Sequence, residues 1–303
     1  MSESSLRAVA EVSLLEGPAA ADPTTVVFSD VVGDRLLSLT DGRIEVLAAP
    51  SGRTNGNVFD HTGRLISCEG AEHGPGGGRR IVRRRTPHSE PEVLAERYDG
   101  SRLNSPNDAT VDDIGRIYFS DPRYGARDDL ELNHESVYRI DPDGALERVV
   151  TQPAIERPNG VAVRPDGREL YVVDSNYDSP GGARRIWAFE LDDLGKPSDQ
   201  RLVIDFSPGR GGDGLEVDAA GSLYVCAGIQ NPRSTNETDA VRSGVYVMKP
   251  DGSMIDVIAV ETDVITNCCF GGRDMRDLYV TAGHRLYAGR SGVPGWHAWR
   301  WEA

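Results

Sequence analysis

A single pattern of apolar and polar residues recurs along the chain. It consists of an Asn or Asp, a short extended run of apolar residues, a turn that contains Gly, and a second extended run. The pattern is clearest where Asp213 precedes GLEVDAAGSLYVC. The same pattern follows four asparagines, Asn55, Asn107, Asn159 and Asn267. Short apolar runs bounded by turn residues predict β-strands, so each unit predicts a pair of strands.

The spacing of these units is regular. Successive leading residues are separated by 52, 52, 54 and 54 residues. A period of about 50 residues built from short strands is typical of strands repeated radially around an axis. Residues 16–50 contain a further strand pair, VVFSD and RLLSL, which raises the number of units to six. We therefore predict an all-β, six-bladed β-propeller, with residues 1–303 forming a single domain.

The two ends of the chain are predicted to close the propeller. The first unit is short, which suggests that the N-terminal and C-terminal segments share a blade. Hairpin turns within blades are predicted at Asp41–Gly42 and Asp143–Gly144. The tail VPGWHAWRWEA contains three tryptophans and is expected to pack against the closing blade.

The leading residues of the units are candidates for a binding site. Equivalent positions of a radial repeat occupy equivalent places around its axis, so Asn55, Asn107, Asn159, Asp213 and Asn267 are predicted to form a ring at one mouth of a central channel. An Asn–Gly pair taken singly is more often a hairpin turn. Here other glycines already supply the turns, and a proline directly precedes both Asn107 and Asn159. The coincidence of five such residues at one phase of the repeat favours a site.

Asparagine and carboxylate oxygens, without sulfur, suit a hard cation. Glu16, followed by Gly17 and Pro18, begins the one unit that otherwise lacks a ring member. We expect one divalent cation, with the ligands Glu16, Asn107, Asn159 and Asp213 and with water at the remaining positions. Calcium fits this oxygen set best, and zinc, manganese and magnesium are alternatives.

Composition and charge limit the partners of the protein. The formal net charge is −15, which argues against a nucleic-acid partner or an anionic membrane surface. One basic run, RRIVRRR at 79–85, is expected on a solvated outer strand. The four cysteines lack the spacing of a zinc site or of a disulfide framework, and no apolar run is long enough to span a membrane. Because the N-terminus shows no signal-peptide pattern, we expect a cytoplasmic protein, and its oligomeric state is left open.

Several of these segments resemble the motifs of the gluconolactonase family, which includes regucalcin and the luciferin-regenerating enzyme. The resemblance covers nearly the whole chain and rests on EGP at 16–18, SPND at 105–108, SDPRYG at 120–125, RPNG at 157–160, GDGL at 212–215 and TNCCFGG at 266–272. It implies a six-bladed propeller with one divalent cation in the central channel, held by Glu16, Asn159 and Asp213. It also implies that Asn107 contacts metal or substrate, and that lactone hydrolysis is the commonest activity.

The chemistry expected of such a site is Lewis-acid activation of an ester carbonyl. Asp213 would then be either a general base acting on water or a direct nucleophile. Asn55, Asn107, Arg123 and Tyr124 are placed where they could orient substrate hydroxyls. A sugar lactone such as gluconolactone is the expected substrate. The alternatives are other esters or phosphotriesters, a non-hydrolytic biosynthetic step, or a non-catalytic propeller that serves as a binding platform with a structural cation.

Two departures from the family pattern concern the site. Gly212 stands where the family often has Pro before its acidic ligand. The family's short Glu-His-Gly turn is here the longer EGAEHGPGGG, so His73 could point into the pocket or away from it. A further carboxyl, Asp121, could hold a second cation, although an Asp after a strand is more often a turn cap.

Overall fold

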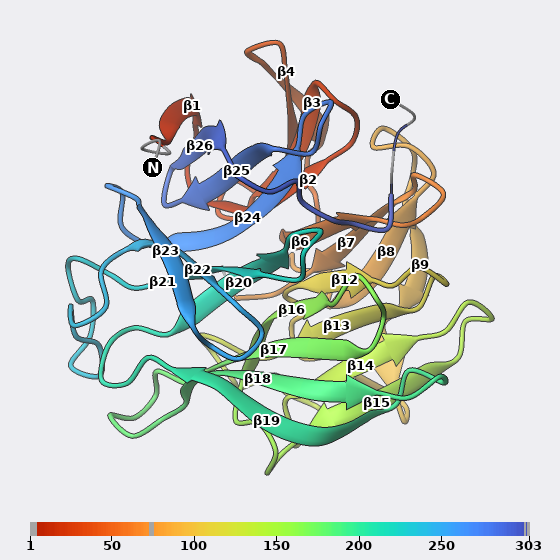
Figure 1. Cartoon of the computed structure of the whole chain (residues 1–303). Helices are drawn as coiled ribbons and strands as arrows, with labels where there is room; N and C mark the ends of the chain where they lie inside the picture. Colours follow the sequence, from red (N-terminus) through yellow and green to blue (C-terminus); the bar gives the residue numbers. More distant parts are fainter. Residues whose placement is uncertain (1–4, 73–75, 300, 302–303) are drawn as a thin grey trace.

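Six four-stranded antiparallel sheets are arranged in a ring in the computed structural model of the protein, which describes residues 5–72, 76–299 and 301 (Figure 1). A separate two-stranded ribbon pairs β10 (Arg97–Tyr98) with β11 (Ser101–Arg102). Within the described residues there is no helix, and hence none that could cross a membrane. The prediction of an all-β, six-bladed β-propeller is confirmed.

The first three blades follow one another along the chain. Blade one contains β2 (Leu15–Ala20), β3 (Thr25–Asp30), β4 (Arg35–Thr40) and β5 (Arg43–Ala48). Blade two contains β6 (Thr54–Phe59), β7 (Leu65–Glu69), β8 (Arg80–Arg84) and β9 (Glu92–Ala95). Blade three contains β12 (Ala109–Val111), β13 (Ile117–Asp121), β14 (Ser136–Ile140) and β15 (Leu146–Thr151).

The last three blades complete the ring. Blade four contains β16 (Pro158–Val163), β17 (Glu169–Ser175), β18 (Arg184–Leu191) and β19 (Pro197–Asp205). Blade five contains β20 (Gly212–Val217), β21 (Leu223–Ala227), β22 (Gly244–Met248) and β23 (Met254–Ala259). Blade six contains β24 (Ile265–Gly271), β25 (Asp277–Ala282), β26 (Arg285–Arg290) and, as its outer strand, β1 (Arg7–Glu11).

The first strand of each blade faces the axis. These inner strands contact one another in a closed circuit, which runs through β2, β6, β12, β16, β20 and β24 and returns to β2. The ring is closed by β1, which pairs with β26 through antiparallel hydrogen bonds and lies beside it in Figure 1. The predicted sharing of a blade by the two chain ends is confirmed, but the shared blade is blade six. Blade one has four strands of its own.

The core consists of apolar layers between neighbouring blades. Tyr118 and Val137 of blade three, for example, pack in one cluster with Val161 and Leu170 of blade four. Further clusters lie between blades four and five, between five and six, and between one and two. Burial of a large apolar side chain contributes about 1.5–3 kcal/mol, so the repeated strands hold the blades face to face.

Two expectations about the periphery need correction. The basic run at 79–85 is not wholly solvated, because Arg79 and Arg84 are buried and Arg79 donates to the carbonyl of Leu103. The C-terminal tail does not stay on the closing blade. Trp296 packs with the cluster of blades four and five, while the indole of Trp299 donates to the carbonyl of Ala21 at 2.9 Å. The tail therefore crosses one face of the ring.

Candidate metal and substrate site

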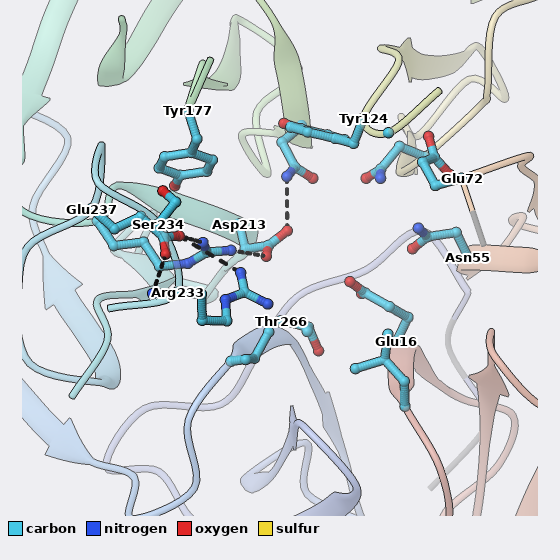
Figure 2. Close-up of a pocket in the computed structure, with 16 residues that line it drawn as sticks. Glu16, Asn55, Glu72, Tyr124, Tyr177, Asp213, Arg233, Ser234, Glu237 and Thr266 are labelled. Atoms are coloured by element: carbon cyan, nitrogen blue, oxygen red, sulfur yellow. Dashed lines mark hydrogen bonds and ion pairs between the residues drawn. The ribbon is translucent and has the colours of Figure 1, made fainter. Parts of the chain in front are cut away.

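A polar pocket lies at the axis of the ring, at the start of the inner strands, and we call it the mouth pocket (Figure 2). Its volume is about 510 Å³. It is lined by Leu14, Glu16, Asn55, Glu72, Asn107, Tyr124, Gly125, Asn159, Tyr177, Arg210, Asp213, Arg233, Ser234, Glu237, Val264 and Thr266. The structure thus brings together in one cavity Glu16 and four of the five predicted ring members.

Bulges in the inner strands present the ring members to the pocket. The pairing register of these strands shifts between Thr54 and Asn57, between Pro158 and Val161, and between Gly212 and Leu215. A bulge re-aims the side chains at its position, and these three bulges contain Asn55, Asn159 and Asp213. The two Asn–Gly pairs therefore belong to bulged strands rather than to hairpin turns.

The glycine after a ring member allows close contact between blades. A Cβ atom on Gly56 would lie 2.6 Å from the carbonyl oxygen of Asn107 in the next blade, and one on Gly160 would lie 2.5 Å from that of Asp213. In addition, the Gly56 amide donates to the Asn107 carbonyl at 2.7 Å. Only glycine permits this approach, which holds the ring members of adjacent blades together.

Asn267 does not occupy the predicted ring position. In β24 the register shift lies between Ile265 and Asn267, so Thr266 lines the mouth pocket instead (Figure 2). The Asn267 side chain lies against Gly214 and accepts a hydrogen bond from the Cys268 amide at 2.8 Å. Because side chains alternate along a strand, a shift of one residue turns Asn267 away from the pocket.

Glu16 and Asp213 are the two carboxylates predicted as metal ligands. Burial raises the pKa of Glu16 well above its usual value, and the negative charges of Asp213 and Asp108 raise it further. Burial also raises the pKa of Asp213, although Arg210 and a hydrogen bond from Asn159 oppose this effect. Carboxylates whose pKa values are raised by burial are costly to ionise without a compensating positive charge.

A set of polar side chains fixes the orientation of Asp213. The Asn159 amide donates to Asp213 Oδ1 at 2.8 Å, and Arg210 approaches Oδ2 at 3.4 Å. Arg210 is itself held by an ion pair with the buried Glu237 and by stacking on Tyr177, with the guanidinium carbon 4.6 Å from the ring centroid. These contacts leave the carboxylate of Asp213 directed into the pocket.

The donor set fits a hard divalent cation. In the described part of the chain Glu16 has no ion-pair partner, and the side-chain amides of Asn55 and Asn107 have no hydrogen-bond partner. The described residues contain no cluster of three or more His, Cys, Asp or Glu side chains suited to a metal. A cation here would therefore be held by two carboxylates together with amide oxygens and water, which is the type of ligand that calcium accepts.

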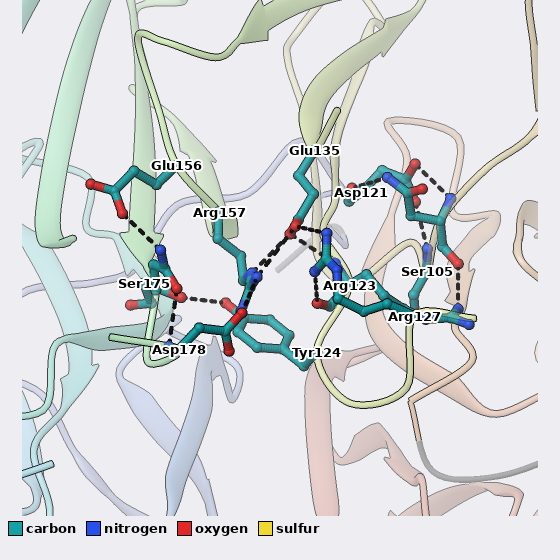
Figure 3. Close-up of polar contacts among 12 residues, drawn as sticks. Ser105, Asp121, Arg123, Tyr124, Arg127, Glu135, Glu156, Arg157, Ser175 and Asp178 are labelled. Atoms are coloured by element: carbon teal, nitrogen blue, oxygen red, sulfur yellow. Dashed lines mark hydrogen bonds and ion pairs between the residues drawn. The ribbon is translucent and has the colours of Figure 1, made fainter. Parts of the chain in front are cut away.

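Tyr124 and Arg123, both expected to contact substrate, have different positions. Tyr124 lines the mouth pocket, and its hydroxyl donates to the Ser175 carbonyl at 3.1 Å. Arg123 is not among the lining residues and is turned into a network behind the wall (Figure 3). Its guanidinium donates to the carbonyls of Asn104 and Ala126 and pairs with Asp129, so its donors are already used in holding loops. Its position does not support the expected contact with substrate.

Two further candidates from the sequence are placed as follows. Asp121 accepts hydrogen bonds from the amides of Asn104 and Ser105, at 2.8 and 2.7 Å, and so caps a turn. This position supports the turn-cap interpretation rather than a second cation site. His73 lies outside the described residues.

Several lining residues were not predicted, and four of them come from two long loops. Glu72 belongs to the insertion after β7, and burial raises its pKa to about 7. Arg233, Ser234 and Glu237 belong to the loop between β21 and β22. The one available signal was the presence of these polar insertions in repeats that otherwise have short connections.

Comparison with known proteins agrees with this architecture. The chain is 29% identical over 299 residues to the gluconolactonase of Zymomonas mobilis subsp. mobilis, an alignment that covers 91% of this chain and 78% of that protein. It is 30% identical over 193 residues to the 6-deoxy-6-sulfogluconolactonase of Pseudomonas putida, with coverage of 63% and 58%. The solved structure of a gluconolactonase from Xanthomonas campestris superposes with a TM-score of 0.80 at 33% identity, over 97% of this chain and 91% of that one.

The family assignment rests on a match that covers most of the chain. Residues 14–284 match the model of the SMP-30/Gluconolactonase/LRE-like region. This range begins just before Glu16 and ends within blade six, so it contains every ring member. The chain belongs to the SMP-30/gluconolactonase/LRE-like family.

Proposed function

We propose that this protein is a lactonase that hydrolyses a sugar lactone with the help of one divalent cation, held by Glu16, Asn107, Asn159 and Asp213. The observation that carries the proposal is the pair of carboxyls, Glu16 and Asp213, whose pKa values are both raised by burial in one pocket, beside side-chain amides of Asn55 and Asn107 that have no hydrogen-bond partner in the described residues. The names of the Zymomonas and Pseudomonas relatives support lactones as the substrate class.

The residues that would bind the cation are oxygen donors, and calcium suits them best. When bound, a divalent cation polarises a carbonyl and stabilises the negative charge that develops on its oxygen. The roles of the chain's own residues follow from their hydrogen bonds.

Asp213 is the proposed catalytic residue. As a general base, its carboxylate takes a proton from water, the water oxygen adds to the lactone carbonyl carbon, and the ring C–O bond breaks with return of the proton to the leaving oxygen. As a nucleophile, its oxygen adds to that carbon, the ring C–O bond breaks and the leaving oxygen takes up a proton, and water then hydrolyses the resulting mixed anhydride and regenerates the carboxylate. Asn159 and Arg210 hold the carboxylate in place for either route.

Substrate orientation is assigned to the remaining polar side chains of the pocket. Asn55 and Asn107 have free amide groups there and can pair with sugar hydroxyls. The Tyr124 hydroxyl already donates to a carbonyl, so this residue offers its ring face to the substrate. A sugar ring has apolar C–H faces, which suit such a contact.

The proposal is tested by metal-dependent turnover of glucono-1,5-lactone. The purified protein is stripped with a chelator, and calcium, zinc, manganese and magnesium are added back separately. We expect one cation to restore hydrolysis and to raise the melting temperature as a ligand of the folded state does. We expect Asp213→Asn to lower kcat/KM by about 100- to 10,000-fold, as loss of an acid–base group does.

The matched control is Asp239→Asn, which makes the same charge change at an exposed position near the pocket loop. Turnover that survives the chelator, or that Asp213→Asn leaves intact, would refute the metal-dependent mechanism. Tight cation binding without hydrolysis of any lactone, ester or phosphotriester would favour a binding platform with a structural cation.

A further inference from the structure

The mouth pocket has two chemically different sides. Figure 2 shows Glu16, Asn55 and Glu72 on one side and Arg233, Ser234 and Glu237 on the other, with Asp213 between them. The second side comes from the loop between β21 and β22, which brings Arg233 to the cavity, where Arg210, from the segment before β20, also lies. A neutral sugar lactone has no group that requires an arginine guanidinium as its partner.

The guanidinium of Arg210 is fully engaged within the protein. It is buried, pairs with Glu237 and Asp213, and stacks on Tyr177. These contacts already give it the negative partners that a buried cation needs. Arg210 therefore holds Asp213 in place and is not available to a ligand.

Arg233 differs from Arg210 in each of these respects. Its side chain is 51% exposed, and its nearest carboxylate oxygen, on Glu237, lies at 3.6 Å, beyond hydrogen-bond distance. Glu237 is already paired with Arg210, so Arg233 shares this carboxylate instead of having it to itself. Within the described residues, the Arg233 guanidinium donates no hydrogen bond, although its backbone amide donates to Glu237 at 2.9 Å.

We propose that Arg233 is a specificity residue that binds a negatively charged substituent of the substrate, so that the preferred lactone carries an anionic group remote from its carbonyl. A carboxylate, phosphate or sulfonate would serve, since each accepts two parallel hydrogen bonds from a guanidinium. The inference rests on the proposed lactonase function and adds the charge of the substrate to it.

The position and size of the pocket agree with this assignment. Arg233 and Asp213 line the same pocket, so the arginine lies on the same cavity as the reacting group. Pockets of about 300–1,000 Å³ accommodate ligands larger than a single sugar ring. The mouth pocket, at about 510 Å³, therefore has room for a lactone ring at the carboxylates and a charged substituent at the loop.

The test compares a neutral and an anionic lactone of the same carbon skeleton. Freshly prepared glucono-1,5-lactone, its 6-phosphate ester and the corresponding 6-carboxylate lactone are assayed with the cation-loaded enzyme. We expect the anionic lactones to have kcat/KM values about tenfold higher or more, through KM, as a charge-assisted hydrogen bond provides. Arg233→Gln should abolish most of this ratio, and Arg233→Lys should retain part of it.

Arg242→Gln is the matched control, because Arg242 is an exposed arginine of the same loop and is not among the residues that line the pocket. A selectivity ratio that is the same in wild type, Arg233→Gln and Arg242→Gln would overturn the proposal, and so would a clear preference for the neutral lactone.

A binding measurement separates this inference from the proposed function. Calorimetry with 6-phosphogluconate and with gluconate does not depend on turnover. Phosphate-dependent binding that Arg233→Gln weakens about tenfold would support the assignment even if no lactone were hydrolysed, in which case only the lactonase proposal would fail. Equal binding of the two acids would overturn the assignment even in an active lactonase.

Discussion

Glu72 is the residue of the pocket with the least predictable chemistry. Its carboxyl lines the mouth pocket, and its Oε1 atom is buried without a hydrogen-bond partner in the described residues. Burial raises its pKa to about 7, although Ser105 and Arg123 oppose the effect. At neutral pH this group therefore exchanges between a carboxylic acid and a carboxylate, and each form would present a different partner to a substrate hydroxyl.

This residue gives a prediction about stability and pH. The pKa of Glu72 is about 7 in the folded state against an ordinary 4.5, so between these values the folded state binds more protons than the unfolded state. The free energy of unfolding therefore decreases as the pH rises through that window. Glu72→Gln should remove this decrease. The free energy of unfolding of the variant minus that of the wild type should therefore increase by about 1–3 kcal/mol between about pH 5 and about pH 8.

The measurement is urea unfolding of both proteins in chelator across that range. Glu45→Gln, which neutralises an exposed carboxyl of β5, is the control and should show a difference that does not change with pH. A constant difference for Glu72→Gln as well would show that Glu72 is ionised in the folded protein throughout.

At the scale of single elements, the bulged inner strands explain how a regular sheet presents a site. Gly17 in β2 shows the requirement most clearly. Its φ angle is +47°, and a Cβ atom there would lie 2.3 Å from the carbonyl oxygen of Asn55 and 2.6 Å from the Cα of Gly56. The glycine after Glu16 is thus needed both for its own backbone conformation and for the approach of blade two.

We expect Gly17→Ala to separate these two requirements when it is compared with Gly42→Ala. Gly42 also has a positive φ, +77°, but a Cβ atom there would meet nothing within 4 Å. Gly42→Ala should cost about 1 kcal/mol of strain. Gly17→Ala should cost about 3 kcal/mol or more, because backbone of the neighbouring blade must move.

Urea unfolding measures both costs, and calorimetric titration with calcium tests the consequence for the site. Since Glu16 precedes the displaced glycine, Gly17→Ala should weaken cation binding, whereas Gly42→Ala should not. Equal costs for the two variants would mean that β2 and β6 can separate without penalty.

At the scale of the whole molecule, stability depends on closing the ring. The outer strand β1 pairs with β26, and Val9 and Ala10 pack against the cluster that contains Leu15 and Leu286. The first residues of the chain thereby fasten the last blade to the first. Without them β26 would become an open sheet edge.

Deletion of residues 1–11 should lower the melting temperature by about 5–10 °C, given that a loss of about 3 kcal/mol is expected for these contacts and pairings. The truncated protein should also associate at high concentration through the exposed edge of β26. Calorimetric scans and light scattering measure the two effects.

Glu11→Gln serves as the control, because it removes only the charge of a side chain that lies 3.4 Å from His284 and 3.6 Å from Arg285. It should change the melting temperature little, as exposed ion pairs do. A truncated protein as stable as Glu11→Gln would show that closure by β1 is dispensable.

The sequence by itself determined the number of blades, the strands and most of the ring. Every blade must bury the same faces against its neighbours, so apolar positions, turns and bulge glycines repeat with one period. Asn55, Asn107, Asn159 and Asp213 line the pocket because they stand at one phase of that period, and Glu16 joins them at the start of the remaining unit. This part of the site could be found from local pattern and spacing alone.

The tertiary structure decided what the period does not encode. In β24 the register shift lies between Ile265 and Asn267, so Thr266 lines the pocket where the repeat predicts Asn267. Arg123, next to Tyr124 in the chain, lies behind the wall, because its donors are used by loops that only the fold brings near. Glu72 and Arg233 reach the pocket from insertions without periodicity. Their positions depend on contacts between distant segments, and no local pattern of residues specifies such contacts.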